Sequence, residues 1–214
     1  MLREVTTNEW FTIIFLISLG ILAFTKYVHT NRFHDFIALL VNSKYLKIYA
    51  RDQKFIDQFD ALLFGNLILS GSVFIFISYQ SVLKPVEFDL VFFLKILTVL
   101  GIVLLIKVLI ERLIGSVFEL DALIDEYVFQ KTSYKNYTGL FLLPVNVIFL
   151  YAVTLTEMWL YIVLGLIFLI NFMGFVTTFK SNQKLILSNF FYFILYLCAL
   201  EIGPYVIMFK VLDI

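Results

Sequence analysis

The feature that most limits what this chain can fold into is a series of long apolar runs that charged residues hardly interrupt. The runs cover residues 9–28 and about 58–80, 88–111, 139–156, 158–179 and 187–210. Each has roughly the 20 residues that a helix needs to cross the ~30 Å hydrocarbon layer of a bilayer. We therefore expect an all-α fold, a polytopic transmembrane bundle of six helices that forms a single membrane domain over residues 1–214.

Composition supports lipid as the surrounding solvent. Hydrophobic residues make up 62% of the chain and charged residues 15%, against about half and about a quarter in soluble domains. This excludes a soluble enzyme, and a net charge of zero gives no basic field for nucleic acid. The single cysteine, Cys198, excludes a disulfide framework and a multi-cysteine metal site.

The order of the apolar runs and the basic residues between them predict how the chain is threaded. The run 9–28 lacks a basic leader and a small-residue cleavage site, so we expect a retained helix. The fourth and fifth runs are nearly continuous, and Thr156, Glu157 and Trp159 mark a tight hairpin between them. Eleven Lys and Arg residues fall on one side of the predicted topology and three on the other. The positive-inside rule then places both termini outside the cytoplasm.

Two segments between the runs carry apolar residues at helical spacing and are predicted to be amphipathic cytoplasmic helices. Segment 31–55 interleaves apolar residues with lysines and arginines, which is typical of a helix at lipid headgroups. Segment 113–130 has an apolar stripe on one face and an acidic face formed by Glu119, Asp121, Asp125 and Glu126. That face is either the solvated extension of the preceding helix or a docking surface for a cytoplasmic partner.

Two charged residues inside the apolar runs need a partner or a function, because a charge in a membrane helix costs at least a few kcal/mol. Lys95 and Glu201 lie at comparable predicted depth and would form an intramembrane ion pair if their helices pack together. Glu201 precedes Gly203 and Pro204, which are predicted to kink the last helix. The acid beside the kink is either part of a structural ion pair or the titrating group of a coupled transporter.

A second polar pattern consists of three amides at matching predicted depth, Asn66, Asn146 and Asn171. They are expected to form an inter-helix polar layer. Such side chains commonly hold transmembrane helices together, at about 0.6–2 kcal/mol each, so the layer serves packing or lines a path.

No catalytic constellation is recognisable in the sequence. Phosphate-binding loops, nucleophile elbows and zinc-protease motifs are missing, and the two histidines, His29 and His34, have too few neighbouring ligands for a metal site. We expect a protein that is not an enzyme and has no cofactor and no metal. An intramembrane enzyme would need a partner to supply the reacting groups.

Two stretches of the chain resemble a known family. They are the run Glu126–Lys131 with Asn136 and Gly139–Pro144, and the run Tyr196–Pro204. Both are similar to a family of small polytopic inner-membrane proteins from Bacteroidota that is catalogued only as a domain of unknown function. The resemblance covers most of the chain and implies a Gram-negative inner membrane with both termini periplasmic. It implies no reaction.

Two functions follow as expectations. The first is a non-enzymatic inner-membrane subunit, a scaffold or accessory factor of a larger cell-envelope assembly for protein export or envelope biogenesis, with other membrane proteins as partners. The alternative is a small proton- or ion-coupled transporter or lipid-handling channel, in which Glu201 titrates and Lys95 is its counter-charge.

Overall fold

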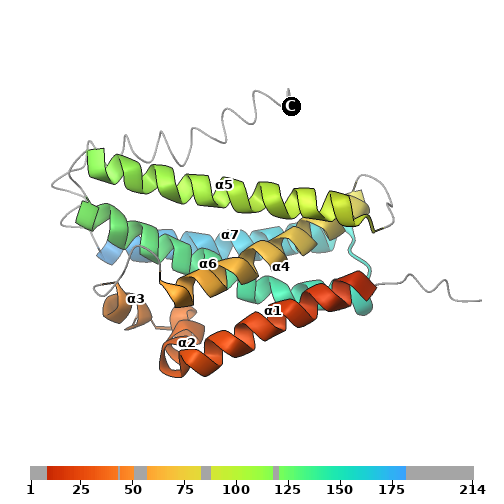
Figure 1. Cartoon of the computed structure of the whole chain (residues 1–214), viewed down its shortest axis with the longest axis horizontal. Helices are drawn as coiled ribbons and strands as arrows, with labels where there is room; N and C mark the ends of the chain where they lie inside the picture. The colour runs from red at the N-terminus through yellow and green to blue at the C-terminus, as the bar shows by residue number, and fades with distance from the viewer. Residues whose placement is uncertain (1–8, 43, 51–56, 83–87, 118–120, 182–214) are drawn as a thin grey trace, which may run out of the picture.

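The structure, a computed structural model, describes residues 9–42, 44–50, 57–82, 88–117 and 121–181. Within these ranges the chain forms helices and no strand, which confirms the all-α expectation (Figure 1). The elements are α1 Glu9–Val28, α2 Thr30–Ile37, the 3-10 turn η1 Ala38–Leu40, α3 Lys44–Tyr49, α4 Gln58–Val82, α5 Leu90–Val117, α6 Asp121–Tyr151 and α7 Glu157–Ser181.

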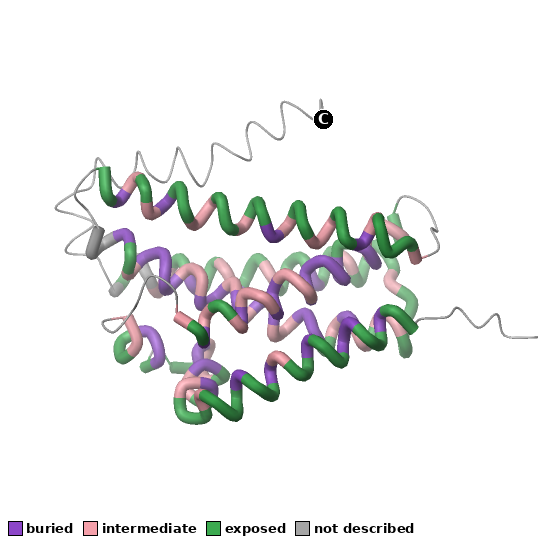
Figure 2. The backbone as a smooth tube through the Cα atoms, in the orientation of Figure 1, coloured by how far each residue is buried: buried purple, intermediate pink, exposed green. Residues whose placement is uncertain are grey.

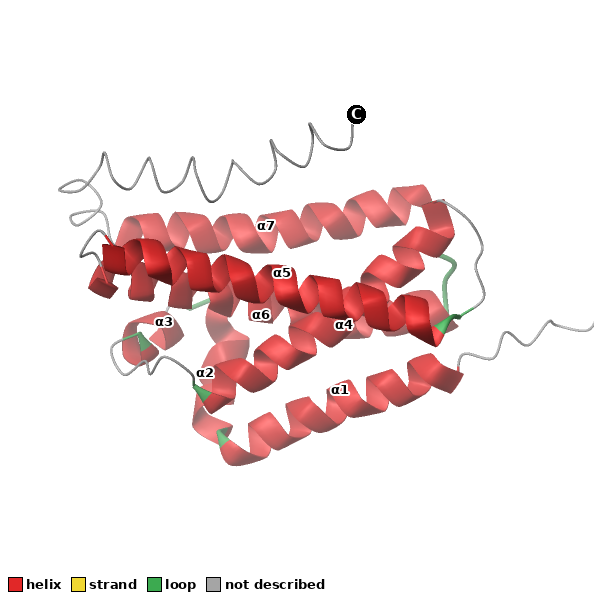
Figure 3. Ribbon diagram, turned by 45° about the horizontal axis from the view of Figure 1, so that its top comes forward, coloured by secondary structure: helices red, strands yellow, loops and turns green. Residues whose placement is uncertain are grey.

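The long helices lie side by side along the long axis of the molecule, and α6 packs against α4, α5 and α7 (Figures 1 and 3). Helix α1 packs against α4. The short elements α2, η1 and α3 gather at one end of the bundle, where α1, α5 and α7 end and α4 and α6 begin. This end is called the basic end below, because it carries Lys26, Arg32, Lys44, Lys47 and Lys180.

Four helices are long and apolar enough to cross a membrane, which indicates a membrane protein. They are α1, α4, α5 and residues Glu157–Thr177 of α7, and they correspond to the predicted runs 9–28, 58–80, 88–111 and 158–179. The predicted run 187–210 lies outside the described residues. The predicted run 139–156 falls within α6, which is not among the four.

Helix α6 differs most from the sequence expectation. It runs without a break through residues 121–151, so that most of segment 113–130 and the run 139–156 belong to one helix, which contains Pro144. Its first half is buried in the bundle: Ile124, Val128 and Phe129 are inside. A polar stretch follows within the same helix, and some of its side chains are bonded to the helix backbone. One example is Ser133, whose hydroxyl donates to the carbonyl of Phe129 over 2.9 Å.

Segment 31–55 also differs from the single amphipathic helix expected. Its described part forms α2, η1 and α3, and its apolar face packs onto α4 and α6. Phe36 and Tyr45 are fully buried, and Tyr45 stacks on Phe129 of α6 at a ring distance of 5.8 Å. Much of the apolar face that predicted contact with lipid headgroups is therefore covered by the protein itself, while Ile37, Val41 and Ile48 remain exposed.

The connection between α6 and α7 lies a few residues before the predicted hairpin, since Glu157 and Trp159 belong to α7. The amides of Ala152 and Val153 both donate to the carbonyl of Ile148, which closes the end of α6. The amide of Leu160 donates to the carbonyl of Thr156 and opens α7. Residues 152–156 thus suffice to reverse the chain.

Candidate functional site

The predicted ion pair lies only partly within the described residues. Lys95 is exposed on α5, about a turn and a half beyond Leu90 where the helix begins. Glu201, Gly203 and Pro204 lie outside the described part of the chain. Lys95 forms no ion pair with another described residue, so its charge needs water, lipid headgroups or a partner beyond these ranges.

Of the three predicted amides, Asn146 and Asn171 bond to groups on neighbouring helices and not to one another, and Asn66 makes no hydrogen bond in the described structure. The Nδ2 of Asn146 in α6 donates to the carbonyl of Ser70 in α4 over 2.8 Å. The Nδ2 of Asn171 in α7 donates to the hydroxyl of Thr138 in α6 over 3.2 Å and to the carbonyl of Ile167 over 2.8 Å. Asn66 lies in α4 one turn before Ser70 and is fully buried. Two amides therefore connect α6 to the helices on either side of it.

Several buried polar side-chain atoms without a hydrogen-bond partner lie at the contact between α4 and α6. Both side-chain atoms of Asn66, the hydroxyl of Ser70 and the Oδ1 of Asn146 are buried and have no hydrogen-bond partner in the described structure. An unpaired buried polar atom costs about 1–3 kcal/mol. A cluster of them inside an apolar bundle is typical of a place that holds buried water or a polar ligand. We refer to Asn66, Ser70 and Asn146 as the polar cluster.

Helices α4 and α6 approach closely beside the polar cluster. A Cβ atom added to Gly139 of α6 would lie 2.5 Å from the Cα of Leu67 in α4, which is closer than any real Cβ contact. Only glycine at this position lets the two backbones meet. The close approach brings Asn146 within reach of the α4 backbone.

The predicted docking surface is divided by the structure. Glu119 and the side chain of Asp121 lie outside the described part. Asp125 is exposed and stands 3.7 Å from the Nε of Arg112 in α5, and Glu126 accepts a hydrogen bond from Gln130 over 3.0 Å. The two described carboxylates therefore make contacts within the protein, while Asp125 also faces outward.

A charged cluster at the basic end was not predicted from the sequence. The guanidinium of Arg32 bonds the carboxylates of Asp57 and Asp60, the latter over 3.0 Å, and lies 4.5 Å from the centre of the Phe59 ring. The hydroxyl of Tyr45 donates to Asp60 over 3.4 Å. Burial and then the charge of Asp60 raise the pKa of Tyr45 far above its usual range. Asp57 and Asp60, three residues apart at the start of α4, are the sequence feature from which this cluster could have been predicted.

A second ion pair joins α5 to α6. The carboxylate of Glu111 is 1% exposed and accepts a hydrogen bond from the Nζ of Lys131 over 2.5 Å. From the sequence alone, Glu111 is expected beside Lys107, which lies one turn away on the same helix. In the structure Glu111 pairs with Lys131, which is 20 residues further along the chain, and no local sequence pattern predicts this contact.

His29 immediately precedes α2, and His34 lies within this helix. The structure does not bring the two histidines together with other metal-binding side chains of the described residues. Among the described residues, no group of three or more His, Cys, Asp or Glu side chains lies together. The ring of His29 packs edge-on against Phe59 at 5.7 Å.

The outward face of α5 is apolar and exposed along the whole helix. Only 6% of its span is buried, against 56% of the span in α4 (Figure 2). Its buried residues are Phe93, Gly101, Glu111 and Gly115, and its exposed ones run the length of the helix: Leu90, Val91, Leu94, Val99, Ile102, Val103, Leu105, Ile106, Leu109, Ile110, Leu113 and Val117. This face, called the α5 face below, must meet lipid or another apolar helix.

Comparison with known proteins identifies the family of this chain but no reaction or ligand. The chain matches no curated protein and no solved structure. A family defined by the domain of unknown function DUF4271 matches residues 11–212, which is most of the chain. The all-helical bundle with its four membrane-crossing candidates therefore belongs to the DUF4271 family, a domain of unknown function.

Proposed function

We propose that this protein is a non-enzymatic subunit, a scaffold or accessory factor, of a larger cell-envelope assembly such as one for protein export or envelope biogenesis. In this proposal the chain has six membrane spans, sits in the inner membrane of a Gram-negative member of the Bacteroidota, and has both termini in the periplasm. The gathering of basic residues at the end formed by α2 and α3 supports a cytoplasmic position for that end.

The observation that carries this proposal is the α5 face. A helix that packs its own bundle with only a few side chains leaves its whole length available to another helix. Van der Waals packing and inter-helix hydrogen bonds drive association in lipid, and Thr98 and Lys95 are polar groups exposed on this helix. A subunit that docks laterally into an assembly needs such a face.

The test is site-specific photo-cross-linking in native membranes, followed by affinity purification in mild detergent and mass spectrometry. A photoreactive residue at Val99, on the α5 face, is compared with one at Leu16, which is equally exposed on α1. We expect a stoichiometric adduct with another membrane protein from Val99 and lipid adducts from Leu16. Lipid adducts or adducts within the same chain from both positions, together with a protein that purifies alone, would contradict the proposal.

A second candidate function is a proton- or ion-coupled transporter or lipid-handling channel. The polar cluster favours it, because unsatisfied atoms of Asn66, Ser70 and Asn146 lie inside the bundle where a polar path would run. Lys95 and Glu201 would be its charged pair. Replacing Glu201 by Gln should then abolish proton-coupled flux in proteoliposomes while the protein level stays unchanged, and full flux in that variant would exclude this role of Glu201.

A further inference from the structure

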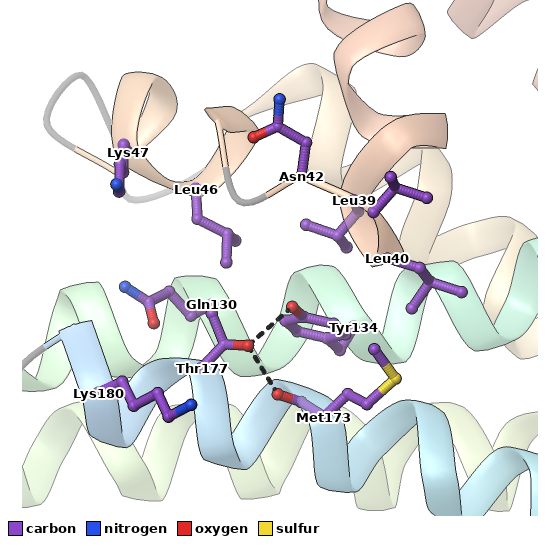
Figure 4. Close-up of a pocket in the computed structure, with 11 residues that line it drawn as sticks. Leu39, Leu40, Asn42, Leu46, Lys47, Gln130, Tyr134, Met173, Thr177 and Lys180 are labelled. Atoms are coloured by element: carbon purple, nitrogen blue, oxygen red, sulfur yellow. Dashed lines mark hydrogen bonds between the residues drawn. The ribbon is translucent and has the colours of Figure 1, made fainter.

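A pocket at the basic end is separate from the polar cluster and from the α5 face. It lies between the η1–α3 segment and the facing ends of α6 and α7, with a volume of about 420 Å³ (Figure 4). This is within the range of small-molecule sites in proteins, about 300–1,000 Å³. The side chains that line it include apolar, amide, hydroxyl and ammonium groups, so its chemistry is that of an amphiphile site.

The pocket contains a hydrogen-bond acceptor that has no donor. Gln130 is 1% exposed, and its Nε2 donates to Glu126 over 3.0 Å, which fixes the orientation of the amide. Gln130 lines the pocket, and its Oε1 is buried just behind the pocket wall with no hydrogen-bond partner in the described structure. A buried acceptor of this kind is normally satisfied, so the ligand should bring an N–H or O–H group.

Two ammonium groups flank the same pocket. Lys47 comes from α3 and Lys180 from the last turn of α7. Neither is paired with a carboxylate of the described residues, whereas the nearby Lys44 and Lys131 are paired with Asp35 and Glu111. Two cations on facing walls of one pocket, without a counter-ion among the described residues, favour an anionic ligand such as a phosphate (Figure 4).

The remaining lining is apolar and reaches the surface. Leu39, Leu40 and Leu46 cover the side formed by the short helices, and Met173 covers the side formed by α7 (Figure 4). Val41 lines the pocket and is 92% exposed. An exposed valine beside a polar pocket is suited to contact an acyl chain that leaves the site.

We propose that this pocket binds the headgroup of a phospholipid that carries a hydrogen-bond donor beyond its phosphate. Lys47 and Lys180 bind the phosphodiester, Gln130 accepts from the ammonium or hydroxyl of the headgroup, and the leucines contact the glycerol and the start of the acyl chains. The inference does not depend on the assembly proposal, because it concerns a pocket within one chain and no partner protein.

The experiment measures lipid binding to the purified full-length protein in detergent by native mass spectrometry. The probes are phosphatidylethanolamine, phosphatidylglycerol and phosphatidylcholine with identical short acyl chains, together with glycerophosphoethanolamine and inorganic phosphate. Phosphatidylcholine keeps the phosphate but has no N–H. We expect it to bind about tenfold more weakly than the other two lipids, the effect of losing one hydrogen bond to a buried acceptor.

Three variants separate the contributions. The double variant Lys47→Gln/Lys180→Gln should bind all three lipids about tenfold more weakly, or weaker still, because the lipid phosphate loses both cations. Gln130→Met, of similar size, should abolish the preference over phosphatidylcholine while binding persists. Lys44→Gln is the matched control, a nearby lysine outside the pocket, and should change nothing. A thermal unfolding curve checks that each variant is folded.

Two results would overturn the proposal. One is equal binding of all three lipids to the wild type and to the double lysine variant. The other is binding of glycerophosphoethanolamine or inorganic phosphate as tight as that of the lipids, which would assign the pocket to a soluble phosphate compound.

Discussion

At the scale of single residues, one charge at the basic end, that of Arg32, is held by specific partners inside the protein. Arg32 is surrounded by Asp57, Asp60 and aromatic rings, and Tyr45 is buried beside Asp60. Lys44, by contrast, is exposed and 3.6 Å from Asp35, a surface pair worth at most about 1 kcal/mol. The buried cluster ties α2 and α3 to the start of α4.

The raised pKa of Tyr45 makes alkaline stability dependent on this residue. Below the unfolded pKa of about 10, both states keep the phenol proton. Above it the unfolded state releases the proton and the folded state retains it, so stability falls with rising pH by up to about 1.4 kcal/mol per pH unit. At pH 7 the variant Tyr45→Phe should be about 1 kcal/mol less stable than the wild type, because it lacks the hydrogen bond to Asp60. Between pH 10 and 11 the free energy of unfolding should fall less in the variant than in the wild type, because the variant has no phenol at this position.

Thermal or denaturant unfolding in detergent at each pH measures this difference. Tyr27→Phe, which changes a largely exposed side chain, is the control and should follow the wild-type curve. Parallel curves for the wild type and Tyr45→Phe above pH 10 would show that the Tyr45 hydroxyl does not titrate differently in the two states.

The contact of Gly139 with Leu67 allows a single methyl group to test the α4–α6 packing. Gly139→Ala would place its Cβ against the α4 backbone, so the helices must separate, and we expect a loss of about 1–3 kcal/mol. Gly165→Ala in α7 is the matched control, because its Cβ would meet no atom within 4 Å. Unfolding by denaturant measures both, and an equal effect at the two glycines would contradict the close approach.

At the scale of elements, α6 is the helix that organises the bundle. It bonds α4 through Asn146, α7 through Asn171 and α5 through the Glu111–Lys131 pair. Its first half and its middle carry the polar groups that lower its hydropathy, and several of them, such as Ser133 and Thr138, donate hydrogen bonds inside the protein. A helix that is polar in sequence is thereby stable in an apolar environment.

The ion pair between α5 and α6 gives the prediction at this scale. Lys131→Met leaves the carboxylate of Glu111 buried without its cation and should cost about 3–5 kcal/mol, measured by unfolding in detergent. The double variant Glu111→Gln/Lys131→Met removes both charges and should recover most of that loss. If the effects of the two single changes simply add in the double variant, the pair does not couple the helices.

At the scale of the whole molecule, the helix directions bring the basic residues to one end. Lys44 lies at that end, and Met158 lies at the start of α7 at the opposite end, both exposed. In a Cys198→Ser background, Met158→Cys should react with a membrane-impermeant maleimide from the periplasmic side, and Lys44→Cys only after the inner membrane is permeabilised. The reverse labelling pattern would invert the proposed orientation.

From the sequence alone one obtains the all-helical fold and four membrane-crossing candidates of the described chain, because a span must be long, apolar and internally hydrogen-bonded. The sequence also predicts a chain reversal at Thr156 to Trp159, close to the turn at residues 152–156, because turn residues are a local signal. The continuity of α6, the pairing of Glu111 with Lys131, and the contact of Arg32 with Asp57 and Asp60 appear only in the tertiary structure. Those outcomes depend on which helix faces meet, and residues far apart along the chain carry no periodic pattern that specifies their partners.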